Sequence, residues 1–446
     1  MNSRKKETIK QHQGYKRFEN DLKRRKQKSV LPNISIDSNS ELLHLSLPYR
    51  TSFIKFFDKK FNSIPSESKS IKVPKRLSFT SDFDRTTRTF NNLHYALFRS
   101  KEFITIDFKN CKFLSIGTGT ILQIMIQNFY SFKARFNDSR YKKITKELKI
   151  KPSSHLKTNK MLFALNIIDE FEGMDELEES GFLALDLKSG SKSKSNYKEN
   201  IKGRLCTEVN DFVNKSMSPS GYELQPKASK YLQNLLGEIL GNAEDHSELN
   251  TYYINGVSFK EPDDSDLTIE LNLCIVNYGY SFYEGFKKTE EKNIIVRDKM
   301  RRYYFNHMNI LGGKHDGNFT EESLYTLYGL QEGVSRLKYD EKSRGNGTMN
   351  FIKAFINLGK FAKEKAIYKP QMNLISGHTV ITCTDEYAPY EKDMRFWLSL
   401  NKEQNLGKLP DRKCIFANKE SFPGTILQVK IFMNKENFSK VVKNGG

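Results

Sequence analysis

The sequence lacks paired cysteines. Its five cysteines are scattered along the chain and none forms a CxxC pair: Cys111, Cys206, Cys274, Cys383 and Cys414. An odd, scattered set excludes a disulfide framework and a cysteine zinc site. We therefore expect five buried free thiols and a reducing compartment.

Long apolar runs are also missing. The chain has no run of about 18 apolar residues, the length that a membrane-spanning helix requires. Its first residues are charged and contain no apolar segment typical of a secretory signal peptide. These absences predict a cytoplasmic protein without a membrane partner, and 446 residues are enough for two ordinary domains.

Acidic residues are too few to balance the basic ones, and the formal net charge is +20. Residues 1–30 contribute eleven Lys or Arg against three acidic residues, a net charge of +8. Such a balance indicates either a surface for nucleic acid or another anionic partner, or a lysine-rich solvated surface. The arm is either a helix that frays in isolation or a flexible basic tail.

A first α/β unit is predicted over residues 75–185. The apolar run Phe103–Phe108 is typical of a strand, and Gly117 and Gly119 permit a tight turn into the apolar stretch Ile121–Phe129. Residues 103–125 resemble the core of STAS domains, the fold of anti-sigma-factor antagonists. That resemblance implies a phosphoacceptor in the loop, where Ser115 and Thr118 are the candidates. A strand-loop-helix unit of another α/β fold is the alternative.

Residues 186–200 are rich in Lys, Ser and Gly, and such a composition buries too little apolar area to order itself. We interpret this segment as a linker or a mobile loop. After it, residues 231–246 have a helical pattern in which Leu232, Leu236, Ile239 and Ala243 share one buried face.

Beside that face the same helix carries polar side chains at positions i, i+4 and i+7, namely Glu238, Asn242 and Asp245. A carboxylate there can orient or deprotonate water, and an amide oxygen one turn away can ligate a hard cation such as Mg²⁺. Taken alone, the pattern equally describes an exposed polar stripe.

Three further motifs follow this helix in order. Strands are predicted at residues 252–259 and 267–277, the second with one face in the core, and it runs into Asn277-Tyr-Gly279-Tyr-Ser281. Arg344-Gly345-Asn-Gly347-Thr348 precedes an apolar helix at 349–358, where bare backbone and the helix dipole favour phosphate. Pro423-Gly-Thr425 opens a strand at 426–432.

This ordered set resembles the GHKL superfamily, the ATP-binding fold of DNA gyrase, MutL, histidine kinases and anti-sigma-factor kinases. The resemblance implies an α/β fold in which residues 201–435 form an α+β two-layer sandwich with ATP and Mg²⁺ as cofactors. It follows the smaller STAS-like domain, and residues 1–70 form the basic arm and a lead-in.

The resemblance also implies roles for individual residues. Asn242 would ligate Mg²⁺, Glu238 would activate the attacking water or position the acceptor, and Asp245 completes the N-box. The adenine side would comprise Asn277, Gly279 and Thr425. The phosphates would lie against Arg344, Gly345, Gly347 and Thr348.

Two positions depart from the family pattern. Asn277 stands where the family has Asp, so its amide oxygen accepts from adenine without a charge, and Ser281 replaces the second glycine. Loss of the charge costs about 1 kcal/mol. Both changes leave open a site that senses nucleotide more than it hydrolyses it.

The long insertion at 283–342 lies where the family has its ATP lid, and it is basic at Arg297, Lys299, Arg301, Arg302, Lys314, Arg336 and Lys338. It would close on the γ-phosphate, or it is only a surface excursion. None of the eight histidines has the context of a histidine-kinase phosphoacceptor, and we interpret His246 as a structural residue.

Three functions remain open. The first is a slow Mg²⁺-dependent ATPase that switches a protein partner, and the second is a protein serine/threonine kinase. The third is a non-hydrolysing nucleotide sensor that binds nucleic acid through the basic arm. The sequence leaves a homodimer open.

Overall fold

A five-stranded antiparallel sheet is the central element of the structure. A computed structural model of the chain describes residues 70–98, 104–137, 147–174, 182–191, 201–218, 223–260, 268–312, 317–334, 347–359 and 369–433. The sheet has the order β6-β7-β8-β12-β9, and every neighbouring pair is antiparallel. Its strands are β6 (Leu183–Ser191), β7 (Ser247–Lys260), β8 (Ile269–Gly279), β12 (Ile415–Met433) and β9 (Gln371–Thr384).

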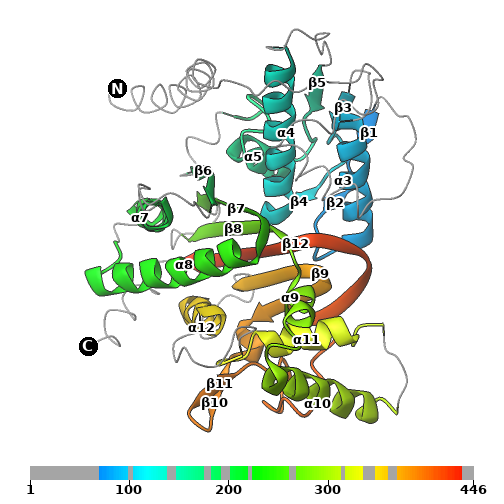
Figure 1. Cartoon of the computed structure of the whole chain (residues 1–446). Coiled ribbons are helices and arrows are strands. Elements are labelled where there is room, and N and C mark those ends of the chain that lie inside the picture. Colours follow the sequence, from blue (N-terminus) through cyan, green and yellow to red (C-terminus); the bar gives the residue numbers. More distant parts are fainter. Residues whose placement is uncertain are drawn as a thin grey trace, which may run out of the picture. The chain divides into compact units, whose positions relative to one another are not determined.

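Three helices cover one face of this sheet, which we call the helix face. They are α7 (Ile201–Met217), α8 (Pro226–His246) and α12 (Gly347–Gly359), and Figure 1 shows α8 lying along the strands. The expected apolar face of α8 is confirmed, since Leu236 and Ile239 are buried while Leu232 and Ala243 pack against the same core. That core includes Leu273 and Ile275 of β8.

The other face, which we call the second face, is covered by the N-terminal α/β unit (Figure 1). This unit contains a parallel three-stranded sheet of order β1-β3-β5 and the short parallel pair β2-β4. Its elements are β1 (Ser70–Lys72), β2 (Arg76–Leu77), α3 (Phe83–Phe98), β3 (Ile104–Asp107), β4 (Phe113–Leu114), α4 (Ile116–Asn137), β5 (Leu148–Lys151) and α5 (Leu156–Ala164).

The cover on the second face corrects the expectation for the strand at 267–277. Every residue of β8 is buried, whereas the alternating pattern predicted one core face. Cys274, Val276 and Tyr278 belong to a core shared with the N-terminal unit, while Leu271, Leu273 and Ile275 belong to the core of the helix face. Alternation distinguishes the two faces of a strand, but it does not report that both are covered.

Two further expectations about local structure are wrong. Residues 186–191, predicted as part of a linker, belong to strand β6 and pair with β7, while residues 192–200 lie outside the described ranges. Gly117 and Gly119 do not form a turn, because α4 already begins at Ile116. Their lack of a side chain allows close packing instead: a Cβ at Gly117 would meet Gln428 Oε1 at 2.6 Å.

The insertion at 283–342 is helical in its described part. It contains α9 (Phe282–Lys288), α10 (Ile294–Ile310) and α11 (Glu321–Gly329). Met300, Leu324 and Leu327 are buried in the core of the helix face. A mere surface excursion is therefore excluded for these helices. After β9 follow a 3-10 turn, η4 (Asp385–Tyr387), and a hairpin of β10 (Tyr390–Lys392) and β11 (Arg395–Trp397).

The basic residues of this insertion have different surroundings. Arg297 pairs with Asp298, and Arg301 pairs with Glu290. Lys299 and Arg302 are exposed, while Lys314, Arg336 and Lys338 lie outside the described residues. Within the described ranges no helix is both long enough and apolar enough to cross a membrane.

All five cysteines are buried and free, as the sequence predicted. Burial raises the pKa of the Cys274 thiol to about 12 and that of the Cys111 thiol to about 11. These side chains are therefore neutral, apolar parts of the core at physiological pH.

Candidate nucleotide site

Helix α8 presents the predicted polar residues on its solvent side. Glu238, Asn242 and Asp245 are all exposed, whereas Leu236 and Ile239 are buried beneath them. Their spacing of one turn places Glu238 and Asn242 on one side of the helix. The structure therefore places a carboxylate and an amide together and leaves both accessible to a ligand.

Asn277 joins the end of β8 to the last turn of this helix. Its Nδ2 donates to Ala243 O at 3.2 Å, and the side chain is buried, with 3% of the residue exposed. In the register of β8 and β12, Asn277 lies opposite Thr425. Because Nδ2 is used by the helix, Oδ1 is the end of the amide that can accept a hydrogen bond from a ligand.

Gly424 allows the close approach of β12 to β8 at this point. Its φ is +136°, and a Cβ there would overlap Asn277 O. The sequence prediction that Pro423-Gly-Thr425 opens a strand is wrong, because β12 starts at Ile415 and runs through these residues with irregular pairing to β9. Glycine is thus required here by backbone contact within a strand.

Ser376, on β9, extends this row, although the sequence analysis did not identify it. Its Oγ lies 3.1 Å from Thr425 Oγ1 and accepts from Phe282 N at 2.9 Å. The interruption of the apolar strand by Ser376-Gly377 was the available signal. Asn277, Thr425 and Ser376 therefore line up across three adjacent strands on the helix face.

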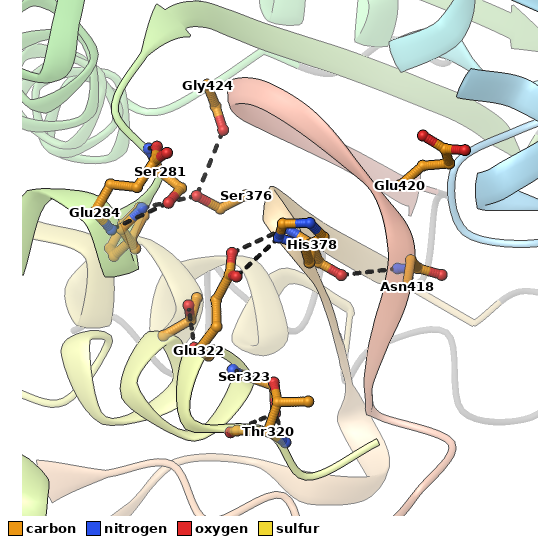
Figure 2. Close-up of polar contacts among 12 residues, drawn as sticks. Ser281, Glu284, Thr320, Glu322, Ser323, Ser376, His378, Asn418, Glu420 and Gly424 are labelled. Carbon is orange, nitrogen blue, oxygen red and sulfur yellow. Dashed lines mark hydrogen bonds and ion pairs between the residues drawn. The ribbon is translucent and has the colours of Figure 1, made fainter. Parts of the chain in front are cut away.

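The start of α9 explains why residue 281 is not a second glycine. Ser281 is the N-cap of α9, with its Oγ accepting from Glu284 N at 3.1 Å and its own N–H donating to Glu284 Oε2 at 2.8 Å. Such a capping box stabilises the first turn of a helix. Ser281 therefore has a structural role at the entrance to the insertion (Figure 2).

A second contact fastens the insertion to β9. Glu322, on α11, accepts from His378 N at 2.9 Å, and its other carboxylate oxygen lies 2.9 Å from His378 Nδ1 (Figure 2). Gly377 has φ +59°, and a Cβ there would overlap Glu322 Oε1. Glu322 and His378, neither of which the sequence analysis selected, hold α11 beside the row that ends at Ser376.

The remaining predicted site residues are only partly described. Gly347 and Thr348 form the start of α12, which contacts α8, and Gly279 is the last residue of β8. Arg344 and Gly345 lie outside the described residues, so their predicted contact with phosphate stays a prediction. Among the described residues no group of three or more His, Cys, Asp or Glu could hold a metal.

His246 lies at the C-terminal end of α8. Its ring stacks on Phe282 of α9, with centroids 5.8 Å apart and planes 9° apart. This packing agrees with the structural role that the sequence indicated.

The two candidate phosphoacceptors in the N-terminal unit are buried. Ser115 is the residue before α4, and its Oγ accepts from Thr118 N at 3.4 Å and lies 2.9 Å from Thr118 Oγ1. Thr118 Oγ1 also donates to Leu77 O at 2.7 Å. Both hydroxyls therefore stabilise the start of α4, which argues against a phosphoacceptor role in this conformation.

No protein-family model, curated protein or solved structure matches this chain. The basic arm at residues 1–30 lies outside the described ranges, so nucleic-acid binding stays a prediction, as does a homodimer.

Proposed function

We propose that the chain binds ATP with Mg²⁺ on the helix face and hydrolyses it slowly to switch a protein partner. The observation that carries this proposal is the position of Asn277 between two other motifs. Asn277 lies opposite Thr425 in the register of β8 and β12, and its Nδ2 lies 3.2 Å from Ala243 O. These residues come from three separate motifs of the sequence. A chance resemblance of one motif to the family would not bring the other two beside it in the fold.

The surrounding residues fit such a ligand. Asn277 offers one amide oxygen to an adenine amino group, and Thr425 adds a hydroxyl beside it. Asn242 offers an exposed oxygen of the kind that Mg²⁺ prefers. Gly347 starts α12 without a side chain, next to α8, and a helix start favours phosphate.

Within this arrangement Glu238 is the residue that we assign to water activation. It is exposed and lies one helical turn from Asn242, so it can reach water beside a phosphate that Mg²⁺ holds. Mg²⁺ supplies charge neutralisation at the phosphates when it is bound. The uncharged Asn277, where the family pattern has Asp, favours nucleotide sensing and slow turnover over fast hydrolysis.

Calorimetry with ATP, with and without Mg²⁺, tests the binding proposal. We expect Asn242→Ala to remove most of the gain in affinity that Mg²⁺ gives to the wild-type protein. Asn234→Ala is the matched control, because Asn234 is an exposed asparagine on the same helix. Absence of ATP binding by the wild type, or equal Mg²⁺ dependence in the two variants, contradicts the proposal.

Turnover is tested with Glu238→Gln. We expect this variant to bind ATP with unchanged affinity and to release phosphate at least about 100-fold more slowly, the usual size of a general-base contribution. Glu244→Gln, a substitution of another glutamate on α8, is the control. With radiolabelled ATP, label on a partner protein in place of free phosphate would assign the same site to a protein kinase.

A further inference from the structure

The second face of the sheet contains a cavity that the proposed nucleotide site does not use, and charged and amide side chains stand among its mainly apolar lining. The cavity has a volume of about 90 Å³ and lies between the N-terminal α/β unit and strands β8, β9 and β12. It is lined by Lys112, Lys157 and Lys430, by one carboxylate, Glu270, and by amide side chains that include Gln428.

Side-chain parity separates this cavity from the nucleotide site. On β12, Gln428 lines the cavity, whereas Leu427 and Ile431 belong to the core of the helix face. On β8, Glu270 lines the cavity, while Asn277 contacts α8. Successive side chains of a strand point to opposite faces, so the two sites share strands without sharing these side chains.

Positive charge exceeds negative charge around the cavity. Glu270 is 4% exposed and pairs with Lys430 at 2.8 Å and with Lys157 at 3.3 Å. Within the cavity lining, two ammonium groups therefore contact a single carboxylate. Lys112 adds a third, and it has no ion pair among the described residues.

Two uncharged side chains of the lining, Thr158 and Gln428, can each donate a hydrogen bond. Thr158 lines the cavity and is 2% exposed, and its hydroxyl has no hydrogen-bond partner among the described residues. A buried polar group without a partner marks a place where a missing partner would be stabilising. Gln428 uses its Oε1 to accept from Gly117 N at 3.2 Å, so its amide nitrogen remains as a donor.

Helix α4 adds to the same field. It begins at Ile116, which lines the cavity, and 22 residues form the helix. Its first N–H groups are occupied, since Gly117 donates to Gln428 and Thr118 donates to Ser115. The contribution of the helix is therefore the positive end of its dipole rather than free donors.

From these observations we propose that the cavity binds a phosphate group. A lining with three lysines and one carboxylate suits a phosphate, which carries about −1.5 to −2 at pH 7, better than it suits a singly charged carboxylate. The cavity, of about 90 Å³, has room for a phosphate group. The ligand is therefore free phosphate or the phosphate end of an ester.

Binding of inorganic phosphate to the full-length chain, measured by calorimetry at constant ionic strength, tests the proposal. We expect Lys112→Gln to weaken binding about tenfold and Thr158→Val about fivefold, the sizes of a charged and a neutral hydrogen bond. Lys299→Gln, which removes a charge from exposed α10, should bind phosphate as the wild type does.

Thr158→Val also separates binding from folding. Because the hydroxyl has no partner among the described residues, its replacement by a methyl group should not lower the unfolding temperature. Weaker phosphate binding at unchanged stability supports the site. Absence of binding by the wild type, or equal affinity in wild type, Lys112→Gln and Thr158→Val, overturns it.

Two further measurements identify the source of the phosphate and the independence of the site. Tight binding of glycerol 3-phosphate indicates a phosphate ester, and binding of inorganic phosphate alone indicates the free anion; both support the proposal. Asn242→Ala should bind phosphate like the wild type, since Asn242 lies on α8. The nucleotide proposal can therefore fail while this one holds.

Discussion

Removing the charge of Glu270 tests how the N-terminal unit is fastened to the sheet. The Glu270 carboxylate on β8 bonds to Lys157 of α5, in the N-terminal unit, and to Lys430 of β12, and Asn272 Nδ2 donates to it at 3.0 Å. Burial raises the pKa of Glu270, but Lys430 and Lys157 outweigh it, and the pKa falls from 4.5 to about 2. The ionised form is thus the stable one in the folded protein.

The size of the effect follows from this shift. A folded-state pKa below the unfolded one gives stabilisation that is complete above about pH 4.5 and is lost as the pH falls toward 2. The shift corresponds to about 3 kcal/mol at pH 7 and about 1 kcal/mol at pH 3. Since Lys157 is 69% exposed, solvent screening reduces the expected loss in Glu270→Gln to about 2 kcal/mol at pH 7.

Urea unfolding of wild type and Glu270→Gln at pH 7 and pH 3 measures this difference. The comparison cancels the other carboxylates, which titrate in both proteins. Glu391→Gln, a substitution of an exposed glutamate on β10, should change stability by less than about 0.5 kcal/mol. A loss in Glu270→Gln that is as large at pH 3 as at pH 7 would refute the electrostatic reasoning.

Two further predictions concern the row beside α8. In thermal unfolding, Gly424→Ala should destabilise the protein by more than about 2 kcal/mol, because the new Cβ would overlap Asn277 O. Gly237→Ala should instead stabilise it by about 0.5–1 kcal/mol, because Gly237 lies inside α8 with open space around the new Cβ. Glu322→Gln should lower the free energy of unfolding by about 1–2 kcal/mol and speed hydrogen exchange in α11, because the charge-assisted bonds to His378 weaken. Unchanged exchange in α11 would contradict the role of this contact.

The sequence predicted best where one segment carries its own pattern. The apolar spacing of Leu236 and Ile239 identified α8, and alternation identified β8. It failed for β6, because the polar residues Lys188–Ser191 become a strand only through pairing with β7. It also failed at Gly117, whose need for a missing side chain comes from Gln428, more than 300 residues away.

The candidate site was predictable to a similar extent. Spacing alone placed Glu238, Asn242 and Asp245 on one face of a helix. The order of the motifs along the chain identified Asn277 and Thr425 as further candidates. Local sequence could not show that Asn277 donates to Ala243 or that Ser376 completes the row. Those contacts depend on the order of strands β8, β12 and β9, which only the folded sheet defines.

Gly424 is the position at which the two faces of the sheet depend on each other. Most substitutions on β12 affect one face, because Thr425 contacts Ser376 on the helix face and Gln428 lines the cavity on the second. Gly424 instead lies at the irregular pairing between Phe422, which packs in the core of the second face, and Thr425. A shift of the backbone there must move both neighbours, so Gly424→Ala should weaken nucleotide and phosphate binding together, whereas Asn242→Ala and Thr158→Val each weaken one.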